Sequence, residues 1–252
     1  MNRIAFIGLT SMIMVFTVSC KKDVDHEQNV PSNKPVIAFN FDNVIDGIPV
    51  QTTQISYTNA AGNLYSVGDM KYYISNITLV KPGGEEVNAG NYKLIDVSDP
   101  ATGKFELEGF EEGDYIAVKM YLGVDSVQNI SGPQLGDLDP TNGMLWDWHS
   151  GYIFFKHEGS FIDSTGYQEG IYYHYGTIAA LVTLEFPINL SLKTEHMPTF
   201  HMIFDINRLY STPNQIDFNG NYIHQSNGPN DAQWLKDMRE NFHFAFELDH
   251  ID

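Results

Sequence analysis

The sequence predicts an all-β protein, an antiparallel β-sandwich with long structured loops and a short C-terminal helix. From Pro35 onward, apolar and polar residues alternate in short runs separated by Gly, Asn, Asp and Pro turns, the pattern of half-buried strands. Helical periodicity appears clearly only over residues 231–241, where Asn230 or Asp231 would cap the helix. The length of 252 residues and the 42% hydrophobic content suit one large β domain.

The expected strands are rich in β-branched and aromatic residues, which favour extended structure. The strongest run, 72–80, ends in the turn sequence Lys81-Pro82-Gly83-Gly84. The full set of expected strands is 36–41, 72–80, 92–97, 115–122, 152–157, 178–192, 199–206 and 242–248. No internal repeat or second linker interrupts this series, so we expect residues 35–252 to form one domain.

The N-terminal residues have the features of an export signal. Residues 1–19 combine a weakly positive start with an apolar run that is too short to span a bilayer. The sequence Thr17-Val18-Ser19-Cys20 resembles a bacterial lipobox and predicts a lipid anchor on Cys20. Residues 20–34 are polar and predict a flexible tether. We therefore expect an extracytoplasmic lipoprotein anchored to the cell envelope, at the outer membrane.

Charge and cysteine content exclude several classes of protein. The chain has 14 Lys and Arg against 32 Asp and Glu, a formal net charge of −18, which argues against a nucleic-acid partner because phosphates are neutralised by basic side chains. Cys20 is the only cysteine, so neither an intramolecular disulfide nor a cysteine-based zinc site can form. The acidic balance leaves cations as natural partners.

The central segment 121–160 differs from the rest of the chain because glycines divide it into turns. Such loops on a rigid scaffold often carry binding residues. Its methionine, tryptophan and histidine residues are Met144, Trp146, Trp148, His149 and His157. Methionine and imidazole suit copper better than magnesium or calcium. The alternative is that tryptophan and methionine plug one end of the sandwich core.

The same segment carries oxygen ligands that suit calcium. Asp125, Asp137, Asp139 and Asn142 approach the alternating Asp/Asn spacing of a calcium loop. Pro140 interrupts that pattern, and the glutamate required at the twelfth position is absent. These residues are therefore candidates for calcium, with Asx turns as the structural alternative.

The remaining histidines give weaker signals. In the run 199–206, His201 and Asp205 share a mixed face, which predicts a half-buried and hydrogen-bonded imidazole. His243 is expected on the exposed face of the last strand. His250 belongs to the C-terminal tail, and we expect no function for it.

Seven ordered segments carry a family resemblance. They are Tyr72-Tyr73-Ile74-Ser75-Asn76-Ile77, Tyr92-Lys93-Leu94-Ile95-Asp96, Leu122-Gly123-Val124-Asp125-Ser126, Leu138-Asp139-Pro140, Gly143-Met144-Leu145-Trp146-Asp147-Trp148-His149-Ser150-Gly151-Tyr152, Lys156-His157-Glu158-Gly159 and Tyr173-His174-Tyr175-Gly176. Together they resemble the MbnP-like copper-binding domain family over roughly residues 35–210. The M-x-W-x-W-x-x-G-Y block and the later K-x-E-G are the most specific parts.

The resemblance implies an extracytoplasmic β-rich protein that holds copper with histidines and an oxidised tryptophan, kynurenine, made by a dihaem peroxidase partner. His174 matches the family motif and is the best single histidine, with His149 as a second candidate. Trp146 or Trp148 would be the oxidised residue. Indole offers only an N–H donor, whereas kynurenine exposes an aniline nitrogen.

No motif for hydrolytic or other catalysis stands out, so we expect a protein that is not an enzyme. A second class of function is a glycan- or protein-binding module without metal. In that class, Trp146, Trp148 and nearby tyrosines would form an exposed stacking platform.

Overall fold

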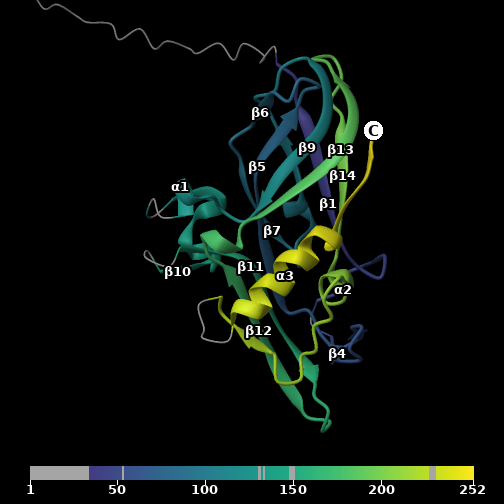
Figure 1. The fold of residues 1–252 in the computed structure, drawn as a ribbon, viewed down its shortest axis with the longest axis vertical. Coiled ribbons are helices and arrows are strands. Elements are labelled where there is room, and N and C mark those ends of the chain that lie inside the picture. The colour runs from purple at the N-terminus through teal and green to yellow at the C-terminus, as the bar shows by residue number, and fades with distance from the viewer. Residues whose placement is uncertain (1–33, 53, 130–131, 133, 148–150, 227–230) are drawn as a thin grey trace, which may run out of the picture. The chain divides into compact units, whose positions relative to one another are not determined.

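Two β-sheets pack against each other around a shared hydrophobic core in the computed structural model (Figure 1). The structure describes residues 34–52, 54–129, 132, 134–147, 151–226 and 231–252. The expected signal peptide, Cys20 and tether lie outside these residues. The described residues from 34 onward belong to one compact unit.

The smaller sheet has the strand order β16-β14-β1-β2, with β8 beside β1. Its strands are β1 (Ile37–Ile45), β2 (Ile48–Pro49), β8 (Lys104–Leu107), β14 (Thr199–Asp205) and β16 (Phe246–Ile251). The first and last thirds of the domain meet here, because β1 pairs with β14 in parallel. The other pairs of this sheet are antiparallel, as expected for the fold class.

The larger sheet has the order β13-β9-β5-β11-β12-β15, with five short strands at its margins. Its main strands are β5 (Asp69–Val80), β9 (Gly113–Leu122), β11 (Gly151–Ile162), β12 (Gln168–Gly176), β13 (Val182–Leu192) and β15 (Ile223–His224). The marginal strands are β3 (Tyr57–Thr58), β4 (Leu64–Tyr65), β6 (Glu86–Asn88), β7 (Tyr92–Asp96) and β10 (Leu145–Asp147). The strand expected over 178–192 begins later, at Val182, because residues 178–180 form a 3₁₀ turn.

Helices are few and short apart from α3. They are α1 (Ser126–Asn129), α2 (Ile206–Leu209), α3 (Asp231–Ala245) and the 3₁₀ turns η1 (Pro100–Gly103), η2 (Gly136–Leu138), η3 (Pro140–Asn142) and η4 (Ile178–Ala180). None of the helices in the described residues is long and apolar enough to cross a membrane.

The strand expected over 242–248 is wrong in its first half. The helix that was expected to end at residue 241 continues to Ala245, and β16 starts only at Phe246. Trp234, Met238 and Phe242 are spaced four residues apart and are buried, so helical spacing places them on one face. Phe244, which a strand would have buried beside Phe242, is 51% exposed.

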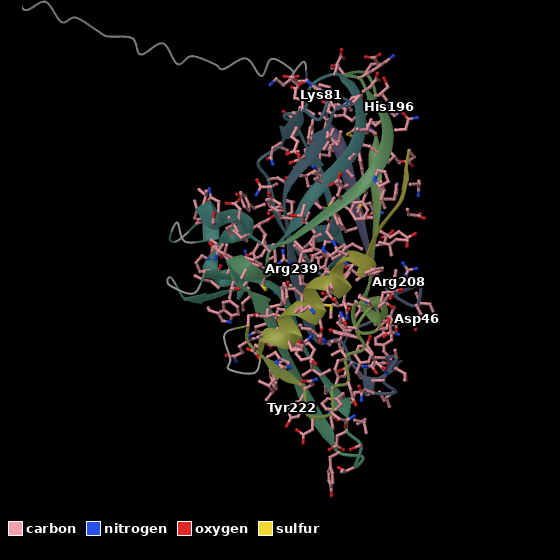
Figure 2. The ribbon with its side chains drawn as sticks, in the orientation of Figure 1. Asp46, Lys81, His196, Arg208, Tyr222 and Arg239 are labelled. Carbon is pink, nitrogen blue, oxygen red and sulfur yellow. The ribbon has the colours of Figure 1, made fainter. Side chains whose placement is uncertain are left out.

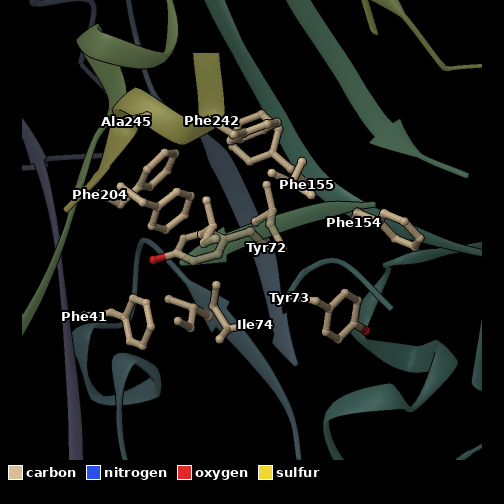
Figure 3. Packing of buried hydrophobic residues seen from close by; sticks show 14 of the residues in the cluster. Phe41, Tyr72, Tyr73, Ile74, Phe154, Phe155, Phe204, Phe242 and Ala245 are labelled. Atoms are coloured by element: carbon tan, nitrogen blue, oxygen red, sulfur yellow. The ribbon is translucent and has the colours of Figure 1, made fainter. Parts of the chain in front are cut away.

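The core between the sheets is mainly aromatic (Figure 3). The ring of Tyr72 on β5 meets Phe204 of β14 edge to face at 5.1 Å between centroids. Phe155 of β11 meets Phe242 of α3 at 5.3 Å. Edge-to-face pairs add stability beyond their buried area, and these two connect both sheets and the helix in one cluster.

The strand β5 is buried on both faces, unlike a typical sandwich strand. Figure 3 shows Tyr72 and Tyr73 pointing to opposite sides of it. The hydroxyl of Tyr73 donates to the carbonyl of Asp137 at 2.9 Å, and its ring meets Tyr152 edge to face. The described residues of the range 123–147, which we call the cover segment, therefore pack over the side of the larger sheet that faces away from the smaller one.

Turns mark the two ends of the large sheet (Figure 2). Lys81 lies in the turn after β5, and His196 lies between β13 and β14 at the same end. Tyr222 lies at the opposite end, where its carbonyl accepts a hydrogen bond from Tyr172 of β12 at 2.8 Å.

Candidate functional site

The outer face of the larger sheet carries polar residues from two of the motif segments. We define this motif face by Lys71 of β5, Lys156 and Glu158 of β11, and His174 and Gly176 of β12. Strand register sets Lys71 opposite Lys156 and Lys156 opposite His174. Alternation along each strand then places Glu158 and Gly176 on the same side.

Lys156 is a buried cation that joins the sheet to the cover segment. Its side chain is 7% exposed, and its Nζ lies 2.6 Å from the carboxylate of Asp69. The same Nζ donates to the carbonyl of Gly143 at 3.3 Å. A buried charge requires such partners, so Lys156 fixes the position of the chain directly before Met144.

His174 is half-buried, and a carboxylate orients it. Its Nε2 lies 2.8 Å from Oε1 of Glu158. In the neutral imidazole that donates Nε2–H to Glu158, the lone pair resides on Nδ1. Carboxylates orient metal-ligating histidines in this way, so His174 has the donor arrangement of a ligand.

Trp146 packs its indole against the same strand. A Cβ atom at Gly176 would lie 2.8 Å from the far edge of the Trp146 ring and 2.7 Å from the carbonyl oxygen of Tyr152. Only glycine fits there, which gives a packing reason for the last residue of the motif Tyr173-His174-Tyr175-Gly176. Trp146 is half-buried, so its indole is not part of an exposed flat platform.

The indole nitrogen of Trp146 is buried and has no hydrogen-bond partner among the residues that the structure describes. Buried donors are normally paired, and an unpaired one costs about 1–3 kcal/mol. This nitrogen is therefore a point on the motif face where a ligand or a chemical change at the indole would relieve an existing cost.

The other residues expected near the metal have different positions. Met144 is fully buried in the hydrophobic core cluster, which favours its packing role over that of a sulfur ligand. His157 points to the inner side, where its Nδ1 lies 2.6 Å from the hydroxyl of Tyr210 and its Nε2 lies 3.1 Å from the carbonyl of Ser66. Burial lowers its pKa to about 4. Trp148 and His149 lie outside the described residues.

Asp125, the first calcium candidate, has local partners for both carboxylate oxygens. One oxygen accepts from Asn76 at 2.7 Å and from the hydroxyl of Tyr92, and the other accepts from the backbone N–H of Val127 at 2.9 Å. Burial raises the pKa of Asp125, but the hydrogen bonds from Tyr92 and Asn76 outweigh it and hold the pKa below its usual value.

The other calcium candidates also serve local structure. Asp137 pairs with Lys93 at 3.2 Å. Asp139 accepts from the backbone N–H and hydroxyl of Thr141 at the start of η3. Asn142 donates its amide to the carbonyls of Gly136 and Asp137. These contacts are the Asx-turn and capping contacts of the structural alternative.

One cluster of potential metal ligands was missed by sequence reasoning. Among the described residues, the one group of three or more His, Cys, Asp or Glu side chains with ligand atoms within 4.8 Å of one another is His201, His250 and Asp252. Alternation places His250 and Asp252 on one side of the last strand, but pairing of that strand with His201 cannot be read from the sequence. The cluster lies on the outer face of the smaller sheet, away from the core side that carries Phe200 and Met202.

Taken together, the fold defines a β protein of two packed sheets, in which one outer face carries Lys156, Glu158, His174 and Gly176 beside a cover segment. The MbnP family model matches residues 34–229. The match covers more than half of the chain, and the chain belongs to the MbnP family.

A solved structure agrees with this assignment. MbnP from Methylosinus trichosporium is similar over 78% of this chain and 86% of that chain, with 16% sequence identity and a TM-score of 0.50. At this identity the likeness supports the fold. Comparison with curated proteins finds no match. Membership of the family supports a copper-related function for the chain.

Proposed function

We propose that the protein is a copper-binding, non-catalytic lipoprotein of the cell envelope, with its copper site on the motif face. The observation that carries the proposal is the family match, which includes the segment from Met144 to Gly159 and the strand with His174. Copper in the cuprous or cupric state accepts imidazole nitrogen. His174 supplies such a nitrogen, and Glu158 orients it.

The donor set on this face fits copper but is incomplete with His174 alone. His149 and the tryptophans Trp146 and Trp148 are the further candidates. Oxidation of one indole to kynurenine by a dihaem peroxidase partner would replace an N–H donor by an aniline nitrogen. Trp146 is the candidate among the described residues: the far edge of its ring packs against Gly176, and its Nε1 has no hydrogen-bond partner within the described part of the chain.

Metal analysis of the full-length protein, exported by means of its own signal peptide, tests the proposal. We expect bound copper in the wild-type chain. Four variants identify the ligands: Trp146→Phe, Trp148→Phe, His149→Ala and His174→Gln. Each substitution that removes a ligand should lower the copper content. Glu158→Gln should weaken binding less, because it changes only the orientation of His174. His243→Ala, an exposed histidine on α3, is the matched control.

Two further measurements separate the parts of the proposal. Intact mass of the protein coexpressed with a dihaem peroxidase reports kynurenine, and the tryptophan substitutions identify its position. Incorporation of labelled fatty acid, with Cys20→Ser as control, reports the anchor. A wild-type chain that contains no copper, and whose thermal stability copper does not change, would contradict the proposed function.

A further inference from the structure

We propose that His201, His250 and Asp252 form a second metal site, which binds a divalent transition-metal ion such as Zn²⁺. The proposal does not depend on copper binding at the motif face. His250 and Asp252 also lie beyond residue 229, where the match to the family ends.

The distances in the cluster are close to those of a metal centre. In a tetrahedral zinc site with ligand bonds of about 2.0–2.1 Å, neighbouring ligand atoms lie roughly 3.3 Å apart. The Nε2 atom of His201 lies 3.3 Å from Oδ1 of Asp252. All three ligand atoms fall within 4.8 Å of one another. The imidazole planes of His201 and His250 are nearly parallel, so the ring of His250, whose side chain is 53% exposed, must turn to direct its lone pair at the same ion.

The backbone holds the three side chains together. His201 and His250 are direct partners across β14 and β16, and their rings stack at 4.2 Å with an angle of 6° between the planes. The backbones of Asp252 and Thr199 exchange two hydrogen bonds, so the end of β16 is fixed next to His201. Two imidazoles and one carboxylate make a ligand set that suits zinc and other divalent transition metals.

Neighbouring polar groups determine which ring nitrogen of each histidine carries the proton and which one offers a lone pair to a metal. Nδ1 of His250 lies 2.8 Å from the carboxylate of Asp249, which favours the tautomer with the lone pair on Nε2. The amide nitrogen of Asn40 lies 3.4 Å from Nδ1 of His201, and the buried amide oxygen of Asn40 has no hydrogen-bond partner in the described part of the chain. Rotation of that amide would let this oxygen accept from Nδ1–H and release the His201 Nε2 lone pair for a metal.

The surroundings favour a cation and leave it accessible. Asp42 and Asp249 add negative charge beside the ligands, since Asp42 contacts Asn40 and Asp249 contacts His250. An open groove of about 380 Å³ runs next to His201 and is lined partly by Lys104 and Glu106. The ion can therefore enter from solvent and keep water as its remaining ligand, as in open zinc sites.

Calorimetric titration of the untagged full chain with Zn²⁺ at neutral pH tests the site. We expect one ion per chain, with an affinity at least about tenfold lower in His201→Ala and in His250→Ala, since even loss of an outer-shell partner lowers metal affinity 10–100-fold. Asp252→Asn should reduce affinity too. Added Zn²⁺ should raise the unfolding temperature of the wild-type chain but not of the two histidine variants.

Control variants separate this site from the motif face. His243→Ala and His174→Gln should bind Zn²⁺ at the cluster as the wild type does, and His250→Ala should retain any copper bound at the motif face. Circular dichroism verifies that each variant is folded. Zn²⁺ binding that is unchanged in the His201→Ala/His250→Ala double variant, or absent from the wild type, would overturn the second site. Either result leaves the copper proposal to its own test.

Discussion

The imidazoles on the outer faces of the two sheets differ in how strongly they are tied to the fold. On the motif face, His174 is 17% exposed and pairs with Glu158, and the buried Lys156 beside it holds the cover segment. In the C-terminal cluster, His250 and Asp252 are 53% and 66% exposed. The proposed ligand His174 therefore lies among structural contacts, whereas the proposed cluster could bind an ion without disturbing the core.

Some residues of the motif face also have packing roles that involve no ligand. Gly176 is required by the close approach of Trp146, and Lys156 by its contacts to Asp69 and Gly143. These residues can recur in the motif for packing reasons alone. The cluster residues, in contrast, have few structural duties that other side chains could not perform. Four predictions test the comparison.

The largest expected effect concerns the buried His157 behind the motif face. Its pKa is about 4 in the folded chain, against an ordinary 6.5, so the unfolded state binds the proton first as the pH falls. The neutral imidazole of His157 therefore makes a pH-dependent contribution of about 3 kcal/mol to the free energy of unfolding. This contribution is complete above pH 6.5 and is lost as the pH falls towards 4.

Urea unfolding measured from pH 7 to pH 4 reports this loss of free energy. His157→Gln should be less stable at pH 7 but should lose less stability on acidification. Gly83→Ala is the control and should keep the wild-type acid dependence, because it changes no titratable group and its Cβ meets no atom within 4 Å. Parallel curves for His157→Gln and the wild type would refute the assignment.

Gly176→Ala should destabilise the motif face by about 2 kcal/mol, because overpacking against a backbone atom forces strands apart. The new Cβ would lie 2.7 Å from the carbonyl oxygen of Tyr152. Equilibrium unfolding measures the loss, and Gly83→Ala is the control, since a Cβ there meets no atom within 4 Å. If the two variants are equally stable, Trp146 and β11 can move away from the new Cβ at little cost in free energy.

Asp69→Asn should cost about 1.5 kcal/mol by leaving the buried charge of Lys156 with the Gly143 carbonyl as its remaining partner. This value is below that of a fully buried pair, because Asp69 is 40% exposed. Glu185→Gln breaks the exposed pair with Lys119 and should change the unfolding free energy little. An unchanged free energy of unfolding in Asp69→Asn would mean that the ammonium group of Lys156 is hydrated by solvent.

The smallest effect is expected at the cluster. His250→Ala, measured with a chelator present, should change the unfolding free energy by no more than about 0.5 kcal/mol, as is usual for exposed positions. A loss of several kcal/mol without metal would place His250 among the structural residues and would remove the contrast between the two faces.

Sequence reasoning predicted the fold class and most of the long strands. The runs 72–80, 115–122 and 199–206 coincide with the cores of β5, β9 and β14, since β-branched and aromatic residues with period two leave little choice. The expected end of α3 at residue 241 was wrong, because the alternation of Phe242, Phe244 and Phe246 also fits a strand. The burial of Trp234 and Met238, eight and four residues before Phe242, favours the helix.

The family motif and its candidate histidine were also within reach of the sequence. His174 was singled out from Tyr173-His174-Tyr175-Gly176, and the structure adds Glu158 as its partner. The position of His157 was not predictable from its closeness to the tryptophans. Alternation along β11 turns it to the inner side, away from Lys156 and Glu158.

By itself, the sequence determined what local patterns encode: a β-rich domain, its turns, and the short motifs that identify the MbnP family. Pairing between distant strands was decided only in the tertiary structure. The parallel contact of β1 with β14 and the register that sets His201 against His250 join residues far apart in the chain. Such pairings depend on how the whole core packs, because each strand alone exposes the same hydrogen-bonding groups to any neighbour.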